Sequence, residues 1–289
     1  MKKVLFTGAC TALVTPFLDG QINYPMLERL LRYQIDSGIR SVVICGTTGE
    51  APTLSDSEKL EMFRRAKSFV GNDCLIIAGT GSNSTEHTLH LSCAAQECGV
   101  DALLVVSPYY NKANPEGLIL HYEAVAQAVD LPIILYNVPS RTGLDIPVTV
   151  YQRLSSLANI AGVKEASTNI TKLTQIELAC GDELPIWTGN DEHIVPAMAM
   201  GAAGVISVVS NVMPVETQAM AMAAASGDFL TANALRLEMQ PLIEALFSEV
   251  SPIPVKAAMA LIGFECGPCR LPLGPISIEK STKLRTLLA

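Results

Sequence analysis

Short apolar runs recur along the chain, separated by segments that mix apolar and charged residues. The runs are rich in Val, Ile and Leu and too continuous for a sheet with one solvated face. This pattern is typical of parallel strands that are buried on both faces. Eight such runs are present, at residues 3–8, 41–46, 74–81, 101–108, 132–139, 160–166, 184–190 and 202–210.

The segments between these runs have the periodicity of amphipathic helices. Residues 24–38 place their leucines on one helical face, which is the face that packs against a core. Residues 55–71 begin with Ser55 and carry Glu58 three positions later, the signature of a capping box. The same segment ends at Gly71, a residue that favours helix termination.

Eight buried strands that alternate with helices predict an α/β fold, a (β/α)₈ TIM barrel. An open, doubly wound sheet is the alternative. No G-x-G-x-x-G follows the first run, however, and no G-x-x-x-x-G-K-[ST] is present. About 80 residues follow the eighth run, almost all of them helical in pattern. We therefore expect a catalytic barrel over residues 1–227 and a C-terminal helical appendage over residues 228–289.

Composition and charge narrow the range of partners. The chain has 289 residues, 49% of them hydrophobic, with a formal net charge of −8 and no run of Lys and Arg. These values argue against a nucleic-acid partner, which is bound mainly by basic residues. The sequence contains no run of 18 apolar residues, so it predicts no membrane-spanning segment. The first 20 residues are interrupted by Thr and Gly, so we expect no signal peptide and a cytoplasmic protein.

Cysteine and histidine give no metal or disulfide pattern. Eight cysteines are scattered through the chain, several in apolar segments, which favours free thiols in a reducing compartment. The four histidines are dispersed, so we expect no metal site. The sequence CGPC at 266–269 has the spacing of a thiol redox motif. It follows helical sequence near the C-terminus rather than a strand, which favours a helix-terminating turn over a redox role.

Lys164 interrupts the sixth apolar run, AGVKEAS at 161–167. One interpretation is that the strand ends at Val163 and Lys164 is the first solvated residue. The other is that Lys164 lies in a dry pocket, where desolvation favours the neutral amine that attacks carbonyl groups.

Polar residues also follow the other runs, at the positions where a barrel carries its active site. If the barrel forms, Lys164 points into a ring of hydroxyl groups. The residues concerned are Thr47, Thr48, Tyr109, Tyr110, Tyr136, Arg141 and Ser207.

This convergence predicts Schiff-base chemistry. A neutral lysine attacks a ketone, and the resulting iminium favours loss of a proton from the adjacent carbon to give an enamine nucleophile. Tyrosine and threonine hydroxyls can relay the protons. The backbone N–H groups of GTTGE at 46–50 can bind a carboxylate, and Arg141 suits a second one. The pattern suggests a keto acid that is joined to, or split from, another acidic carbonyl compound.

The same motifs resemble those of the dihydrodipicolinate synthase family within the pyruvate aldolase superfamily. The resemblance covers essentially the whole chain, in order and in spacing. It rests on GTTGE at 46–50, SPYYNKANPEG at 107–117, LYNVPSRTG at 135–143, GVKEAS at 162–167 and PIPVKAAM at 252–259. It implies a lyase of lysine and diaminopimelate synthesis that joins pyruvate to L-aspartate-4-semialdehyde, giving 4-hydroxy-tetrahydrodipicolinate. It also implies a homotetramer, a dimer of tight dimers, with no cofactor beyond the pyruvate imine on Lys164.

The resemblance assigns a role to individual residues. Lys164 forms the Schiff base, and Tyr136, Thr48 and Tyr110 form a proton relay in which Tyr110 comes from the neighbouring subunit. Thr47 and Thr48 hold the pyruvate carboxylate, and Arg141 receives that of the aldehyde. Gly189 and Ile206 line the pocket through backbone carbonyls and packing. A feedback site for lysine is implied near Ala51, Asp56, Lys59, Asn83, His87 and Tyr109.

The resemblance is incomplete at this site. Asp56 and Lys59 stand where lysine-sensitive bacterial members carry histidines, and His87 stands where they carry an acid that binds the lysine amine. A cation at Lys59 would repel lysine. We therefore expect weak or absent feedback inhibition. Two alternative functions stay open. Sister aldolases that act on N-acetylneuraminate or keto-deoxy sugars share the lysine and tyrosine, but resemble this chain less at SRTG, 140–143. A non-catalytic binding or regulatory barrel would be expected to lack part of the relay, which is complete here.

Overall fold

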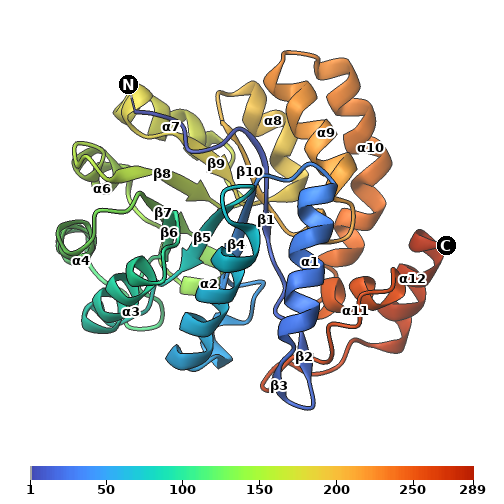
Figure 1. The fold of residues 1–289 in the computed structure, drawn as a ribbon. Helices are drawn as coiled ribbons and strands as arrows, with labels where there is room; N and C mark the ends of the chain where they lie inside the picture. The colour runs from blue at the N-terminus through green and yellow to red at the C-terminus, as the bar shows by residue number, and fades with distance from the viewer. Residues whose placement is uncertain (1) are drawn as a thin grey trace.

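A computed structural model describes residues 2–289 and shows eight parallel strands closed into a barrel (Figure 1). The order around the barrel is β1-β10-β9-β8-β7-β6-β5-β4, so each strand pairs with its neighbours in the chain and the last pairs with the first. The predicted (β/α)₈ barrel is confirmed. The strands are β1 (Gly8–Ala12), β4 (Ser41–Ile44), β5 (Leu75–Gly79), β6 (Ala102–Val106), β7 (Ile133–Asn137), β8 (Ile160–Glu165), β9 (Ile186–Thr188) and β10 (Gly204–Ser207).

Helices surround the barrel and connect its strands (Figure 1). A small antiparallel hairpin, β2 (Phe17–Leu18) and β3 (Gln21–Ile22), precedes the first helix. The α-helices are α1 (Tyr24–Asp36), α2 (Asp56–Val70), α3 (Thr85–Glu97), α4 (Pro115–Ala128), α5 (Pro139–Thr142), α6 (Val148–Leu154), α7 (Thr171–Cys180), α8 (Ile194–Ala199), α9 (Pro214–Ala225), α10 (Phe229–Leu246), α11 (Ile253–Leu261) and α12 (Ile278–Leu288). The 3₁₀ turns are η1 (Ala51–Thr53), η2 (Gly181–Glu183), η3 (Asp191–His193) and η4 (Val209–Asn211).

The capping box predicted for the second helix is present. The Ser55 side chain accepts from the N–H of Glu58, and the Glu58 carboxylate accepts from the N–H of Ser55. Two of the unpaired donors at the helix start are thereby satisfied. The helix ends at Val70 with Gly71 as its C-cap, as the sequence indicates.

The first strand does not lie where the apolar pattern places it. Residues 3–8 were expected to form it, but the strand is Gly8–Ala12, GACTA. The apolar side chain of Phe6 instead stacks on Trp187 with ring centroids 4.8 Å apart, and the Phe6 carbonyl accepts from Trp187 Nε1. The apolar residues before β1 thus pack on the barrel interior from its end, while small residues form the strand.

The core has two layers. Between the sheet and the helices lies a large cluster of aliphatic and aromatic side chains. Inside the barrel lies a smaller cluster that contains Cys10, Ala12, Val43, Ile77, Ala102, Leu104, Ile134, Tyr136, Val138, Ala166, Trp187 and Ile206. Because side chains alternate along a strand, Leu135 of β7 belongs to the outer cluster and its neighbour Tyr136 to the inner one.

The C-terminal helices lie along one side of the barrel. Helix α10 runs beside α9, and α12 packs against α10 and α11 (Figure 1). Lys256 of α11 lies over the ring of Phe17 in the β2–β3 hairpin. The division of the chain at residues 227 and 228 falls between α9 and α10 and stays a prediction.

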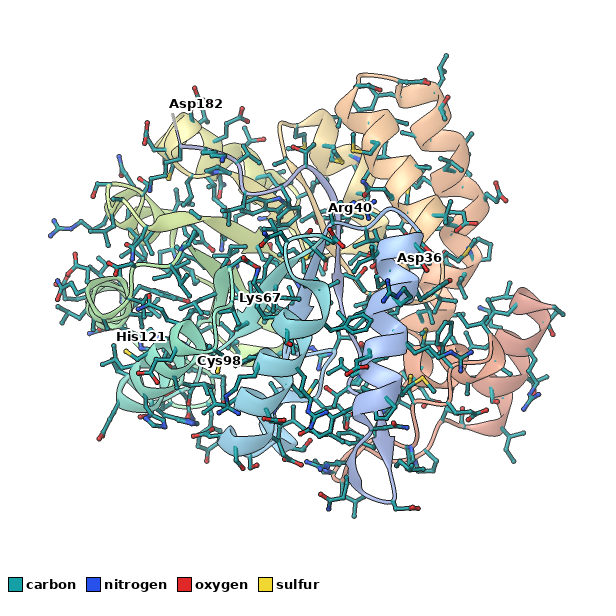
Figure 2. The ribbon with its side chains drawn as sticks, in the orientation of Figure 1. Asp36, Arg40, Lys67, Cys98, His121 and Asp182 are labelled. Carbon is teal, nitrogen blue, oxygen red and sulfur yellow. The ribbon has the colours of Figure 1, made fainter. Side chains whose placement is uncertain are left out.

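Charged side chains at the periphery tie the helices to the sheet. Lys67, labelled on α2 in Figure 2, donates to Asp101 Oδ1 at 2.7 Å. Asp101 Oδ2 accepts from the N–H of Ile76 on β5. Within residues 2–289, no helix has the length and apolar character that crossing a membrane requires.

Candidate active site

Strand β8 continues through Lys164 to Glu165, and both residues are buried. Lys164 is only 5% exposed, so the interpretation in which it is the first solvated residue after the strand is wrong. It pairs in register with Tyr136 on β7, and its Nζ lies 4.4 Å from the centroid of the Tyr136 ring. The two side chains therefore share the barrel interior near the carboxyl ends of adjacent strands.

Gly189 makes room for the lysine. A Cβ at this position would lie 2.8 Å from Lys164 Cε and 2.6 Å from Ala166 Cβ. Its N–H donates to the Glu165 carbonyl at 2.7 Å, which holds the residue after β9 close to β8. Gly189 is not among the residues that line the cavity described below, and its pocket-lining role stays a prediction.

The turn GTTGE is closed by its own backbone. The N–H groups of Gly49 and Ala51 donate to the Gly46 carbonyl, and that of Glu50 donates to the Thr47 carbonyl. The N–H groups of Thr47 and Thr48 take no part in these closing bonds. Thr48 is 4% exposed, whereas Thr47 is half-buried and lines the cavity described below.

Three contacts from distant parts of the chain hold this turn. Thr15 Oγ1 donates to the Gly49 carbonyl at 2.6 Å. Lys256 Nζ on α11 lies 2.9 Å from Glu50 Oε1, and both side chains are almost fully buried. The backbone N–H of Arg270 donates to the other carboxylate oxygen of Glu50 at 2.8 Å. The C-terminal helices thus reach the loop that carries the two threonines.

The same C-terminal segment contacts Arg141. Arg141 lies in the short helix α5, directly after β7, and its Nη2 donates to the carbonyl of Ser251 at 3.1 Å. Its side chain is exposed on one side and lines the cavity on the other. This orientation leaves the remaining N–H groups of the guanidinium for an anionic ligand.

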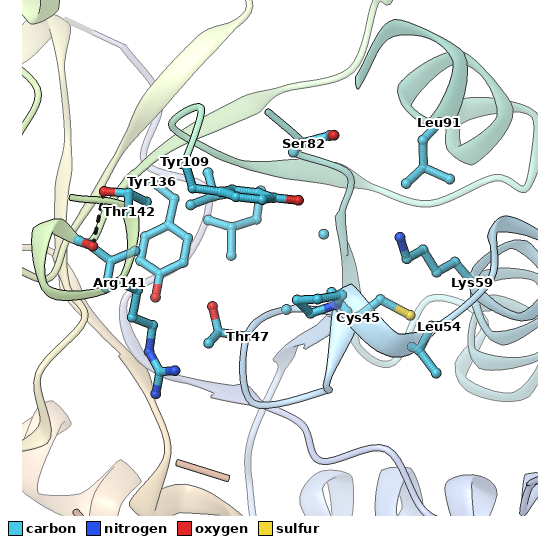
Figure 3. A pocket seen from close by; sticks show the side chains of 18 of the residues that line it. Cys45, Thr47, Leu54, Lys59, Ser82, Leu91, Tyr109, Tyr136, Arg141 and Thr142 are labelled. Atoms are coloured by element: carbon cyan, nitrogen blue, oxygen red, sulfur yellow. Dashed lines mark hydrogen bonds between the residues drawn. The ribbon is translucent and has the colours of Figure 1, made fainter. Parts of the chain in front are cut away.

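A cavity of about 340 Å³ opens among these residues. Figure 3 shows Tyr136, Thr47 and Arg141 at one end, with the Tyr136 hydroxyl directed toward Thr47. Lys59 points in from the other end, and the Tyr109 ring lies between the two ends. Lys164 is not itself among the lining residues; it packs against the ring of Tyr136, which is.

The far end of the cavity contains most of the predicted feedback set. Asp56 Oδ2 lies 2.9 Å from His87 Nε2, and Asp56 Oδ1 lies 3.9 Å from Lys59 Nζ. Ala51 and Tyr109 line the same cavity, whereas Asn83 lies outside its lining and accepts a hydrogen bond from Asn111 through its carbonyl. The carboxylate of Asp56 is therefore already shared between two basic side chains of this chain.

Tyr110 lies apart from the other candidate residues of its own chain. Its side chain is 89% exposed, and its backbone has φ of +71°, an uncommon conformation for a tyrosine. The conformation turns the ring of Tyr110 away from the cavity that Tyr109 lines.

Asp191 is a buried acid that the sequence patterns did not single out. It follows β9, and its Oδ2 accepts from the N–H groups of Val208 and Val209 just after β10. Burial raises the pKa of this carboxyl, while hydrogen bonds from Ser207 and these amides and the charge of Lys164 act against the rise. Asp191 thereby holds the end of β10, the strand that carries Ile206. Its position in TGNDE, after a predicted strand, was the available signal.

The CGPC segment lies in the loop after α11. Burial raises the pKa of Cys266 to about 12 and that of Cys269 to about 11. Thiols with raised pKa values are poor nucleophiles, which works against a redox role. All eight cysteines are free in this structure.

A closed parallel barrel with a cavity at the carboxyl ends of its strands, beside a buried lysine, defines a (β/α)₈-barrel enzyme. Residues 5–289 match the model of the dihydrodipicolinate synthetase family, and the chain belongs to this family.

Individual relatives agree with this family. The chain is 48% identical over 271 residues to a 4-hydroxy-tetrahydrodipicolinate synthase of Lachnoclostridium phytofermentans, covering 93% of this chain and 92% of the relative. A dihydrodipicolinate synthase of Acinetobacter baumannii, solved with pyruvate, superposes with a TM-score of 0.96 at 39% identity, covering 98% of each chain. A solved structure described as a monomeric dihydrodipicolinate synthase variant gives the same TM-score and identity, over 98% of this chain and 96% of that one. The predicted family and enzyme class, a lyase of the 4-hydroxy-tetrahydrodipicolinate synthase type, are confirmed.

Proposed function

We propose that the chain condenses pyruvate with L-aspartate-4-semialdehyde to 4-hydroxy-tetrahydrodipicolinate, in lysine and diaminopimelate biosynthesis. The observation that carries the proposal is Lys164, buried in β8 against Tyr136. A lysine held in this way beside a cavity suits attack on a ketone, and family membership selects pyruvate among ketones.

The first half of the reaction uses Lys164 and the GTTGE turn. The neutral Nζ attacks the ketone carbon of pyruvate, and loss of water gives an imine. The N–H groups of Thr47 and Thr48 hold the pyruvate carboxylate, because the turn closes without them. Removal of a proton from the methyl carbon then gives the enamine, whose carbon is the nucleophile. No cofactor is required, since the covalent imine itself withdraws the electrons.

The second half forms the carbon–carbon bond. The enamine carbon attacks the aldehyde carbon, and Tyr136 and Thr48 move the protons that the imine and the new hydroxyl require. The amino group of the aldehyde then displaces Lys164 from the imine carbon, which closes the ring and frees the enzyme. Arg141 receives the carboxylate of the aldehyde, since its guanidinium faces the cavity.

We infer that the working unit is a homotetramer in the cytoplasm, built as a dimer of tight dimers. The exposed ring of Tyr110 supports the tight dimer within it, because a relay hydroxyl that points away from its own cavity suits the cavity of a neighbouring subunit. Sedimentation of the purified protein tests it: a species of four chains is expected, and a monomer with full activity contradicts it.

A coupled assay tests the reaction. Pyruvate and L-aspartate-4-semialdehyde are supplied with excess dihydrodipicolinate reductase, and NADPH consumption is followed. Turnover is expected in the wild type, loss of turnover in Lys164→Ala, and unchanged turnover in Lys283→Ala, an exposed lysine on α12. No turnover together with a borohydride-trapped pyruvate adduct on Lys164 favours a sister aldolase with another aldehyde. Neither turnover nor adduct favours a non-catalytic barrel.

A further inference from the structure

We propose that Asn137 and Glu165 form a positioning pair that sets the register of β7 and β8 and thereby directs Tyr136 and Lys164 into the barrel. The two residues directly follow Tyr136 and Lys164 along their strands and are themselves partners in register. The inference rests on the proposed role of Lys164 as the nucleophile.

The register of these two strands changes partway along them. Ile133 pairs with Ile160, but Ile134 pairs with Gly162, so Ala161 is an extra residue on β8. Such a bulge reverses the faces on which all later side chains lie. Beyond it, the pairs are Leu135 with Val163, Tyr136 with Lys164 and Asn137 with Glu165.

Hydrophobic alternation does not choose this register. Residues 161–163 are all small or apolar, and Lys164 and Glu165 that follow are both charged. A slip by one residue therefore keeps an apolar strand and exchanges the two charged side chains between the barrel interior and the outer layer. Another interaction has to distinguish the two registers.

The amide of Asn137 supplies this interaction. Its Nδ2 donates to the Glu165 carboxylate, 2.9 Å from Oε1 and 3.0 Å from Oε2, and also to Asp145 Oδ1 at 2.8 Å. Its Oδ1 accepts from the N–H of Ile146 at 3.1 Å, so the amide orientation is set from both sides. Asn137 is fully buried and Glu165 is 3% exposed, so water does not compete for these bonds.

The Glu165 carboxylate is satisfied only in the outer layer. Its Oε1 accepts from the N–H of Ser167 at 2.8 Å, and its Oε2 accepts from the hydroxyl of Tyr151 on α6 at 3.3 Å. Lys172 on α7 lies 3.9 Å from Oε2 and also pairs with Asp145. In the slipped register Glu165 would lose these partners, and Lys164 would take a place beside the cation of Lys172.

A buried polar network of this kind carries a desolvation penalty that apolar residues of similar volume would avoid. What the network adds is that hydrogen bonds depend on direction, whereas apolar contacts do not. Hydrogen bonds specify one register where apolar contacts accept two, which is the role we assign to the pair.

The test measures how fast Lys164 reacts with pyruvate, using borohydride trapping at saturating pyruvate and mass spectrometry of the adduct. Asn137→Leu removes the hydrogen bonds of the amide and keeps the number and branching of the side-chain heavy atoms. It is expected to slow trapping about tenfold or more, since small misplacements of a reacting group have large effects on rate. Glu165→Gln keeps an acceptor oxygen for Asn137 and Ser167 and is expected to remain within roughly threefold of the wild type.

If the pair only positions Lys164, its loss should lower the rate of trapping and leave the affinity for pyruvate nearly unchanged. The pyruvate concentration at half-maximal trapping is expected to stay within about threefold of the wild type in Asn137→Leu, because the GTTGE turn lies on another strand. Ser92→Ala is the matched control: Ser92 is fully buried and donates to Thr80 Oγ1 at 2.9 Å in the same layer of the fold. It is expected to lower thermal stability without slowing trapping. If Asn137→Leu does not fold, Asn137→Ser is used, with a loss of at least about threefold expected.

The outcomes separate this inference from the proposed function. Wild-type protein that forms no adduct on Lys164 contradicts the proposed function. A trapped wild type with folded Asn137→Leu that reacts at the wild-type rate overturns the positioning role alone. A loss of rate in Ser92→Ala equal to that in Asn137→Leu also overturns it, because the effect would then follow general destabilisation.

Discussion

Lys164 and Tyr136 are direct partners on adjacent parallel strands, with Lys164 Nζ 4.4 Å from the centroid of the tyrosine ring. The face of an aromatic ring attracts a cation, so it stabilises both an ammonium group and the iminium formed from it. The ring also walls the amine off from bulk solvent, since both side chains are at most 6% exposed. Tyr136 thus shields the Lys164 amine with its ring and presents its hydroxyl to the cavity.

Replacement of Arg141 is expected to impair use of the aldehyde and to spare pyruvate. In Arg141→Met, kcat/KM for L-aspartate-4-semialdehyde should fall about 10- to 100-fold, the loss typical of hydrogen bonds to a charged group. The KM for pyruvate should change little, because the GTTGE turn holds its carboxylate. Steady-state kinetics with each substrate varied in turn measure both effects. Arg153→Met, at an exposed site on α6, is the control, and an equal loss for both substrates would contradict the assignment.

Replacement of Lys256 is expected to destabilise the protein strongly. Lys256→Met leaves the Glu50 carboxylate buried without its cation, and the free energy of unfolding should fall by about 3–5 kcal/mol. The pyruvate KM should rise as well, because Glu50 ends the turn that carries Thr47 and Thr48. Urea denaturation and steady-state kinetics measure the two effects.

The double variant Lys256→Met with Glu50→Gln tests the cause of that loss. It removes the uncompensated charge and should recover part of the stability. Lys280→Met breaks a surface pair with Glu279 and should change the free energy by less than about 0.5 kcal/mol. A double variant no more stable than Lys256→Met would show that lost packing, rather than charge, dominates.

The pair of Glu58 and Arg270 predicts a contribution to stability that disappears in acid. Hydrogen bonds from Arg270 lower the pKa of Glu58 to about 2, below its ordinary value of 4.5. A carboxyl whose pKa is lowered by folding stabilises the protein above its unfolded pKa, and this contribution is lost as the pH falls from about 4.5 toward 2.

Arg270→Gln is therefore expected to lower the free energy of unfolding by about 1 kcal/mol at pH 7, because the pair lies near solvent. The difference from the wild type should shrink as the pH approaches 2. Urea denaturation at several pH values measures it, with Arg64→Gln on the α2 surface as the control. A difference that stays constant from pH 7 to pH 3 would assign the effect to the backbone carbonyls that Arg270 also contacts.

Lysine is expected to be a weak inhibitor or none. The end of the cavity opposite Tyr136 carries the Lys59 ammonium, which is 8% exposed, and Asp56 there is already shared with His87. A second ammonium would meet repulsion without a free carboxylate. Steady-state rates with up to millimolar L-lysine measure this, and Lys59→Ala should bind lysine more tightly. Half-inhibition of the wild type at sub-millimolar lysine would contradict the prediction.

The apolar pattern is sufficient for most of the fold because parallel strands must be buried on both faces and helices on one. It fails at β1, where Phe6 is apolar because it caps the barrel core, while small residues form the strand. Apolarity alone does not say whether a side chain belongs to a strand or closes the end of a barrel.

The sequence by itself determined the class of barrel, the family and the set of residues at the strand ends, because those residues fall in short local motifs. Only the tertiary structure decided which of them meet. It placed Lys164 beside Tyr136 through a register set beyond a bulge, and it tied Glu50 to Lys256 across about 200 residues of chain. It also turned Tyr110 outward. Burial, register and long-range pairing arise from contacts between distant segments, and no local pattern encodes them.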